Sequence, residues 1–204
     1  MKAFLIALGI VVVGLIALGA VAVGGYNSLV TKQQTVDAQW AQVQNVYQRR
    51  ADLIPNLVNT VSGAANFEKS TLVEVTNARA SVGRLTINAA QAPTSAAQLA
   101  AFDKAQGQLS SALSRLMVVS ERYPSLRATA NFQELQAQLE GIENRIAVER
   151  RRFNEAVLSY DASIKTVPAV FFAAALGFKE KPYFAATPTA QTPPSVKFDF
   201  NDKK

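Results

Sequence analysis

The chain has 204 residues, which is long enough for one domain with a sizeable core and an appendage but too short for two ordinary domains with separate cores. It contains no cysteine and no histidine, which excludes disulfides, the common zinc and haem sites, and nucleophiles activated by an imidazole base. The formal net charge is +6, but basic and acidic residues are mixed along the chain, so we expect no nucleic-acid partner.

The first segment is long and uncharged. Residues 3–25, AFLIALGIVVVGLIALGAVAVGG, match a hydrocarbon core of about 30 Å at ~1.5 Å per helical residue. A cleaved signal peptide is the alternative, but this apolar run exceeds the usual length of its apolar region. We therefore predict a transmembrane anchor over residues 1–25. Lys2 and the free amine on one side, against Lys32 on the other, favour a cytoplasmic N-terminus with the rest of the chain outside.

The segment after the anchor has the pattern of a helix with one buried face. Its apolar residues recur at spacings of three and four: Val36, Trp40, Val43, Tyr47, Ile54, Leu57 and Val61. Arg50 stands at the one position of this register where another apolar residue is expected.

Pro55 falls inside this predicted helix. It removes the amide that would bond to the carbonyl of Ala51. Because the apolar register continues past the proline, we predict one continuous, kinked helix rather than two. The freed carbonyl then needs a donor, for which Arg49, Arg50 and Asn59 are the candidates.

Three further helices are predicted. The second is capped near Asn66, and its apolar face contains Val75, Ala78, Val82 and Leu85. The third starts at a capping box of Ser95 and Gln98, contains Leu99, Phe102, Leu109, Leu113 and Leu116, and stops before Pro124. The fourth starts at a capping box of Asn131 and Glu134, and its apolar face contains Phe132, Leu135, Leu139, Ile142, Ile146, Phe153, Ala156 and Tyr160. The predicted fold is all-α, with a single N-terminal transmembrane helix followed by an antiparallel up-and-down four-helix bundle over residues 26–167.

The fourth helix has one break in its apolar register, at Glu149. The first and last helices of such a bundle are antiparallel neighbours, so their midpoints meet. One hypothesis is that Arg50 and Glu149 approach each other inside the bundle, where an ion pair can fix register without adding net stability. The alternative is that the arginine stem lies along the apolar stripe with its head in water, and that Glu149 faces solvent.

Residues 168–204 form a tail rich in proline and aromatic residues. A short apolar helix is predicted over residues 169–178, with the remainder extended. In one interpretation, the four phenylalanines at positions 171, 172, 178 and 184 dock on the bundle and close its open end. In the other, the alternating SVKFDF stretch forms a strand that a partner captures by edge pairing.

Several stretches of the chain resemble the LemA family of bacterial proteins. After the membrane segment come YNSLV, WAQVQNVYQRRADLIPNLV, FEKSTLVEVTNARA, ERRRFNEAVLSYDASIKTVP and GFKEKPYF. The resemblance covers nearly the whole chain and implies a single-pass protein of the bacterial cytoplasmic membrane with a helical bundle. The positions that match the family's motifs are Arg50, Asp52, Pro55, Asn56, Glu68, Arg79, Arg152, Asn154 and Tyr160, to which we add Glu149 as a structural or interaction candidate.

No catalytic, cofactor or metal site is predicted. Glu140, Glu143 and Glu149 lie on different faces of a helix or toward solvent, and no histidine accompanies them as in helical di-iron proteins. Family members tend to be associated with membrane metalloproteases and small envelope proteins. This implies a non-enzymatic scaffold or adaptor for membrane or envelope proteins, in membrane protein quality control.

The alternative prediction is a bundle that binds lipid or a small apolar ligand between its helices. The lipid bilayer is the partner expected on either hypothesis. Small residues within the anchor, Gly9, Gly14 and Gly19, leave homo-oligomerisation open, although their spacing of five places them poorly on one helix face.

Overall fold

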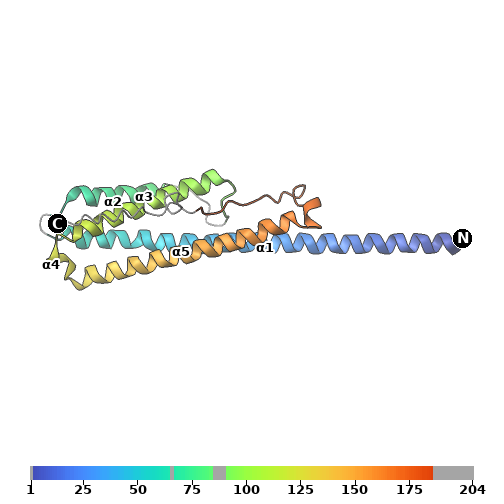
Figure 1. The fold of residues 1–204 in the computed structure, drawn as a ribbon, viewed down its shortest axis with the longest axis horizontal. Helices are drawn as coiled ribbons and strands as arrows, with labels where there is room; N and C mark the ends of the chain where they lie inside the picture. The colour runs from blue at the N-terminus through green and yellow to red at the C-terminus, as the bar shows by residue number, and fades with distance from the viewer. Residues whose placement is uncertain (1, 65–66, 85–90, 186–204) are drawn as a thin grey trace, which may run out of the picture.

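The computed structural model describes residues 2–64, 67–84 and 91–185. All regular secondary structure within these ranges is helical, which confirms the predicted all-α class (Figure 1). The α-helices are α1 (Lys2–Ser62), α2 (Lys69–Gly83), α3 (Ala96–Ser120), α4 (Pro124–Arg127) and α5 (Ala130–Lys165), and a 3₁₀ turn η1 (Ala169–Phe171) follows them. α5 packs mainly along α1, and α2 packs mainly along α3.

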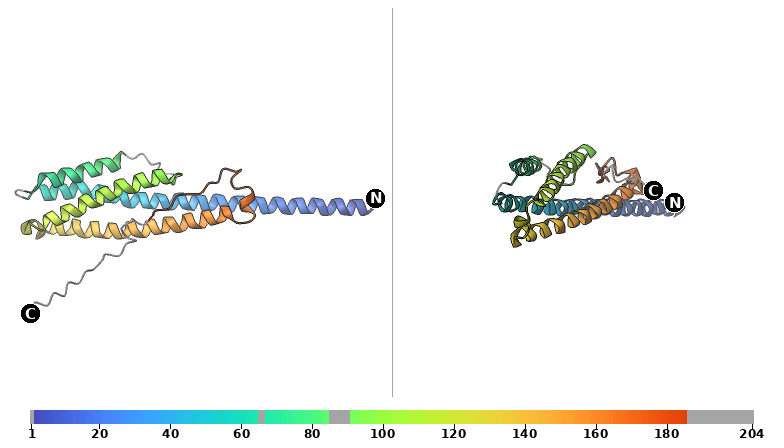
Figure 2. Two further views of the ribbon diagram at one scale, coloured as in Figure 1. Left: turned by 45° about the horizontal axis from the view of Figure 1, so that its top comes forward. Right: turned by 60° about the vertical axis from the view of Figure 1, so that its left-hand side comes forward.

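α1 is one continuous helix of 61 residues that passes through both the predicted anchor boundary and Pro55. At ~1.5 Å per residue it is about 90 Å long. Its first part projects beyond all other helices, as Figure 1 and the left view of Figure 2 show. This part is uncharged after Lys2, its described side chains are exposed, and by length and composition it is able to cross a membrane. The predicted anchor and the first core helix are therefore a single element.

The buried residues form two hydrophobic clusters along the helices. The cluster nearer the projecting part of α1 contains Trp40, Phe102, Phe153 and Tyr160. The far cluster contains Leu57, Leu109, Leu116 and Phe132, among others. The apolar positions predicted for the first helix are all buried, at 5% exposure or less. The spacing of three and four residues thus identified the core face correctly.

The helix starts match the predictions unevenly. Ser95 caps α3 as predicted, because its hydroxyl accepts a hydrogen bond from the Gln98 amide at 3.2 Å. The Gln98 side chain in turn accepts from the Thr94 amide at 3.2 Å, one residue before the expected position. The box predicted at Asn131 is wrong, because α5 begins two residues earlier and its cap is Thr129.

The predicted cap of the second helix, Asn66, lies outside the described residues. The capping position of α2 is Glu68, whose side chain makes no capping hydrogen bond.

After α5 the chain folds back onto the helices as a short loop and an extended segment. The helix predicted over residues 169–178 is reduced to the single turn η1 and further turns, ending at Gly177 with φ of +85°. Phe178 and Phe184 are buried and Phe172 is half-buried, whereas Phe171 is 79% exposed. The docking interpretation is confirmed for three of the four phenylalanines, and SVKFDF lies outside the described residues.

Candidate functional site

A buried arginine joins three helices between the two hydrophobic clusters. Arg50 of α1 is 1% exposed. Its Nη1 donates to Ser110 Oγ at 2.8 Å and to Glu143 Oε1 at 2.7 Å. Its Nη2 donates to the carbonyl oxygen of Gln106 at 3.3 Å and to the side-chain oxygen of the same residue. The guanidinium also lies 5.0 Å from the centre of the Tyr47 ring. One cation therefore links α1 to α3 and α5.

The predicted pairing of Arg50 with Glu149 is wrong, because the partner of Arg50 is Glu143. Six residues separate the two acids, which is about 9 Å along a helix and a rotation to another face. Glu149 instead pairs with Arg152 on its own helix at 2.8 Å. The Glu149 side chain is 15% exposed, and its Oε2 is buried without a hydrogen-bond partner in the described part of the chain.

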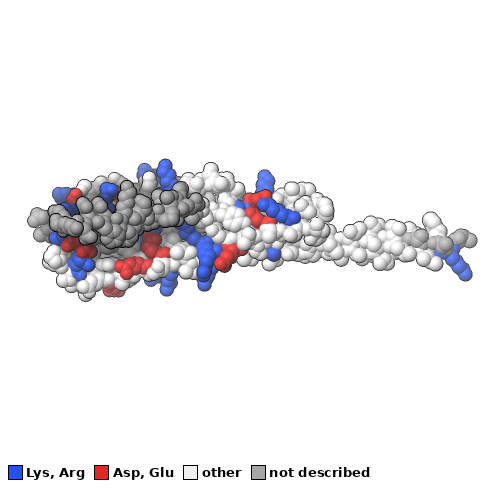
Figure 3. Space-filling view, in the orientation of Figure 1, with Lys and Arg blue, Asp and Glu red and all other residues white. Residues whose placement is uncertain are grey.

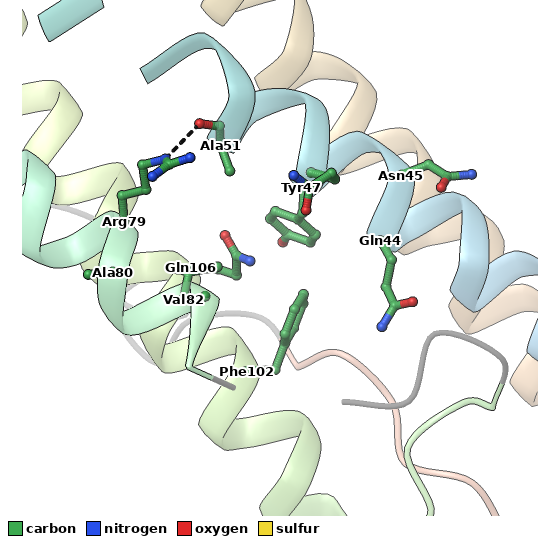
Figure 4. Close-up of a pocket in the computed structure, with 11 residues that line it drawn as sticks. Gln44, Asn45, Tyr47, Ala51, Arg79, Ala80, Val82, Phe102 and Gln106 are labelled. Atoms are coloured by element: carbon green, nitrogen blue, oxygen red, sulfur yellow. Dashed lines mark hydrogen bonds between the residues drawn. The ribbon is translucent and has the colours of Figure 1, made fainter. Parts of the chain in front are cut away.

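The carbonyl that Pro55 frees is satisfied from a neighbouring helix. Arg79 of α2 donates from Nε to the carbonyl of Ala51 at 3.1 Å (Figure 4). The helix continues through Pro55 as predicted, but the donors proposed from α1 itself are not the ones used. Pro55 and Arg79 both match family motifs and lie 24 positions apart in the sequence. Arg79 donates to the carbonyl that Pro55 leaves without its helical donor, so the two residues share one structural role.

Three other candidate residues, Asp52, Asn56 and Glu68, are more exposed to solvent than Arg50. Glu68 accepts a hydrogen bond from Arg122 at 2.8 Å and so connects the start of α2 to the chain after α3. Asp52 accepts from Gln48 at 2.7 Å on the surface of α1. Asn56 is exposed on the same helix. The structure therefore separates Asp52 and Asn56 from the buried arginine.

Two candidate residues of α5 hold the tail in place. The Asn154 side chain accepts from the Phe184 amide at 2.9 Å and donates to the Phe184 carbonyl at 3.0 Å. The buried Tyr160 forms a hydrogen bond with the backbone of Lys179. Asp161, also buried, accepts from the Lys181 amide at 3.1 Å. We call residues 178–185, held in this way, the tail strap.

The ring of Phe184 completes an aromatic cluster in the core. It stacks on Trp40 with 6.2 Å between ring centres and meets the edge of Phe153 at 5.5 Å. The Arg150 guanidinium covers it at 4.3 Å and pairs with Asp103 of α3 at 2.9 Å. The tail strap is therefore part of the folded core.

Burial is the largest influence on the pKa of the two tyrosines at these contacts, Tyr160 and Tyr47. Burial raises the pKa of Tyr160 above its usual 10.0, although the backbone hydrogen bond with Lys179 opposes the change. Burial also raises the pKa of Tyr47, against the opposing charges of Arg150 and Arg50. Both hydroxyls therefore stay protonated at neutral pH and act as neutral hydrogen-bonding groups.

Sequence reasoning missed Gln106, which is 3% exposed and accepts hydrogen bonds from Arg50 through both its side chain and its backbone carbonyl. A signal for it was present. The buried residues of α3 at 99, 102, 109 and 113 follow the same spacing of three and four, and Gln106 occupies the position between 102 and 109. A polar residue at a core position in each of two helices indicates a buried polar contact. Ser110 and Glu143 have no comparable signal, because they border the apolar faces.

A cavity of about 490 Å³ lies beside the buried arginine, between α1, α2 and α3. Tyr47, Phe102 and Gln106 point toward one another into it (Figure 4). The Tyr47 and Phe102 rings meet edge to face at 5.1 Å. The side-chain oxygen of Gln44, which also lines the cavity, is buried without a partner among the described residues. The lining of the cavity thus combines two aromatic rings with the polar side chains of Gln44, Gln48 and Gln106.

Within the described residues, no group of three or more acidic side chains is placed to hold a metal ion. The fold and these contacts define a helical protein in which a segment able to cross a membrane continues directly into a core helix. The model of the LemA family matches residues 39–198, and the chain belongs to this family.

The relatives have two kinds of name. The magnetosome protein MamQ of Magnetospirillum gryphiswaldense is 26% identical over 187 residues, which cover 82% of this chain and 67% of that protein. The magnetosome protein MamQ 2 of Paramagnetospirillum magneticum is 27% identical with the same coverage. The protein LemA of Metamycoplasma hominis is 24% identical over 144 residues, which cover 71% of this chain and 61% of that protein.

Proposed function

We propose that this protein is a membrane-anchored, non-enzymatic scaffold or adaptor that presents a helical bundle to other membrane or envelope proteins. The observation that carries the proposal is the continuity of α1, which passes from the projecting apolar segment into the core without a break. A partner bound to the bundle is thereby held at a fixed height and orientation above the membrane. The absence of histidine and cysteine from the chain supports a role without catalysis.

The architecture proposed for this scaffold is an anchor over residues 1–25, an antiparallel four-helix bundle over residues 26–167, and a tail. Contacts at two levels of α1 and α5 support the antiparallel direction. Lys32 of α1 donates to Ser163 at 2.5 Å, late in α5, whereas Arg50 contacts Glu143, much earlier in α5.

The proposed location is the bacterial cytoplasmic membrane, with the bundle on the outer side. The basic Lys2 at the first end of the apolar segment supports a cytoplasmic N-terminus. The proposed partners are membrane or envelope proteins, including a membrane metalloprotease, and the process is membrane protein quality control. The names of the relatives, LemA and magnetosome protein MamQ, assign no reaction, which is compatible with a non-enzymatic role.

Site-specific photocrosslinking in intact cells tests the scaffold. A photoreactive amino acid replaces one exposed apolar residue on each of three helices: Val73, Val118 or Leu158, which are 57%, 70% and 61% exposed. We expect one of these positions to give a discrete adduct with a membrane or envelope protein that also copurifies in fixed ratio. The buried Val43 serves as the control position, because it should give no adduct with another protein. Adducts limited to lipid at all three exposed positions would contradict the proposal.

The cavity beside Arg50 favours a second candidate function, the binding of a lipid or small apolar ligand between the helices. The Tyr47 and Phe102 rings suit an apolar group, and the amides of Gln44 and Gln48 on the lining suit a polar group at its end. Native mass spectrometry of the purified chain tests this. We expect a bound small molecule that disappears when Ala80→Phe fills the cavity, and a ligand-free spectrum for both proteins would contradict it.

A further inference from the structure

The loop between α5 and the tail strap is uncharged and exposes its large apolar side chains. Residues 166–177, TVPAVFFAAALG, contain no charged residue; Lys165 precedes them and Lys179 follows two positions after them. Val167 is 74% exposed, Phe171 79% and Leu176 53%. Single exposed apolar residues are common on protein surfaces, but several within eleven residues indicate a surface with a partner.

This loop lies at the level where the apolar segment of α1 ends. The Phe172 ring approaches Gly25 so closely that a Cβ built there would lie 3.0 Å from its Cζ. The Tyr26 and Phe178 rings meet edge to face at 5.7 Å. In two views the chain after α5, coloured orange, lies beside α1 where the projecting part begins (Figures 1 and 2).

The length of α1 places this level at the edge of the bilayer. A hydrocarbon core of about 30 Å needs about 20 helical residues, which residues 4–23 supply. Gly25 then lies about 3 Å beyond the core, and the headgroup region extends about 5–7 Å on each side. A loop packed against residues 25 and 26 is therefore within the headgroup region.

Buried residues fix the direction in which the exposed side chains point. Ala169, Ala173 and Phe178 are buried and hold the loop against the helices, which leaves Phe171 on the outside. Charged side chains gather over the bundle, while the surface of the projecting helix is uncharged except near its end (Figure 3). The exposed apolar surface of the loop thus continues that of the membrane segment.

From this continuity we propose that residues 167–177 form an interfacial membrane element that inserts Val167, Val170, Phe171 and Leu176 into the headgroup region of the bilayer that α1 crosses. Such elements gain stability from apolar burial and from cations near anionic headgroups. Lys179 is exposed beside the loop and suits that position, whereas Lys165 at the other end pairs with Glu180 at 2.9 Å. The element is a second membrane contact that prevents the bundle from tilting about α1.

The inference rests on the proposed anchor, so the experiment tests both separately. Because the chain has no cysteine, Phe171→Cys introduces a unique attachment site for the environment-sensitive dye NBD. The full-length protein is reconstituted into phosphatidylcholine and phosphatidylglycerol vesicles that contain lipids with a nitroxide at the headgroup or deep in the acyl chain. Val118→Cys, at a position that is 70% exposed on α3, is the matched control for an aqueous site. Val12→Cys reports on the anchor itself.

We expect the dye at position 171 to emit at shorter wavelength than the dye at position 118. We also expect headgroup nitroxides to quench it several-fold more than they quench the dye at position 118. Equal, water-like emission and equal quenching at both positions would overturn the proposal. Shielded emission at position 171 without quenching by lipid would also overturn it, because a protein would then cover the loop. Strong deep quenching at position 12 shows that the anchor is inserted. If the dye at position 12 were not quenched by the deep nitroxide, the anchor would not be inserted, and this result would count against the proposed function.

A second labelled variant guards against a local effect of the first. Leu176→Cys alters a residue that is 53% exposed and lies outside the buried set. The two positions should show the same preference for headgroup over deep quenching, and a water-like signal at position 176 would contradict an element that inserts as a unit.

Discussion

Arg79 Nε lies 3.1 Å from the Ala51 carbonyl, the group that Pro55 leaves without its helical donor. A proline inside a helix typically costs about 3 kcal/mol, partly through this lost hydrogen bond. A donor from α2 recovers part of that cost and fixes α2 against the middle of α1. Proline and arginine therefore act together as one contact between helices.

We predict that the effect of removing Arg79 depends on Pro55. Arg79→Met should lower the free energy of unfolding by about 1 kcal/mol, since the bond is charge-assisted but exposed to solvent. In a Pro55→Ala background the amide of residue 55 can bond to the Ala51 carbonyl, so the same change should cost less. Urea unfolding of the four proteins in detergent measures the coupling. If Arg79→Met lowered the free energy of unfolding equally in the native and the Pro55→Ala backgrounds, Arg79 would not compensate for the proline, and the prediction would be wrong.

A second prediction concerns the buried cation. Arg50→Met should lower the free energy of unfolding by about 3 kcal/mol, because it leaves the buried Gln106 side chain without its donor. Glu143→Gln should cost only about 1 kcal/mol, since the Glu143 side chain is 47% exposed and solvent screens the ion pair. Thermal and urea unfolding of each variant measure both values.

Glu149 provides the matched control for the pairing. A double-mutant cycle of Arg50→Met with Glu143→Gln should give a coupling energy of about 1 kcal/mol, whereas the cycle with Glu149→Gln should give a value near zero. The distances support this difference, since Arg50 Nη1 lies 2.7 Å from Glu143 while Glu149 pairs with Arg152. A larger coupling to Glu149 would restore the pairing expected from the sequence.

The sequence predicted the core faces well because burial follows helical periodicity. The periodicity placed Arg50 at a core position of the first helix, and the structure shows that its side chain is buried there. It did not predict the partner, because midpoint matching assumes helices of equal length. α1 continues into the apolar segment, so the register between α1 and α5 is set by side-chain packing rather than by their ends. The partner of Arg50 is therefore Glu143, six positions before Glu149 in α5, and helical periodicity alone does not determine such a shift between two helices.

Contacts between distant segments were the other limit. The donor for Ala51 comes from α2, and local reasoning considered only donors on α1. The docking of the tail was predicted from its aromatic composition, but the residues that hold it were not. Asn154 was known only as a position that matches a family motif, and its role depends on the backbone of Phe184, thirty residues away. Composition indicates that a segment is buried, whereas hydrogen-bond partners require the three-dimensional register.

A third prediction tests the attachment of the tail strap. Asn154→Ala removes both hydrogen bonds to Phe184 and should lower the free energy of unfolding by about 1–2 kcal/mol. Hydrogen exchange should become faster at the Lys181 and Phe184 amides, while the amides of α1 near Trp40 keep their protection. Asn154→Asp retains the acceptor but loses the donor, so it should show an intermediate effect at most. Unchanged exchange at position 184 in the alanine variant would show that the aromatic contacts alone hold the strap.

The last prediction is a loss of stability at high pH. Burial raises the pKa of Tyr160 above 10.0, so the folded protein keeps this hydroxyl protonated after the unfolded chain has begun to ionise. The contribution is fully present below pH 10 and is lost as the pH rises through the folded pKa. The pKa of Lys165 is raised by its hydrogen bond with Glu180, and its effect falls in the same range and direction.

The titration of Tyr160 is measured as the tyrosinate absorbance of the native protein minus that of Tyr160→Phe. We expect the difference to rise above pH 10 in the folded protein and near pH 10 in urea, where the tyrosine has its ordinary pKa of about 10. Because this hydroxyl bonds to the backbone of Lys179, the same pH range should release the tail strap, seen as faster hydrogen exchange there. A folded-state titration at or below that in urea would show that the hydroxyl is not buried, and would remove the link between pH and the strap.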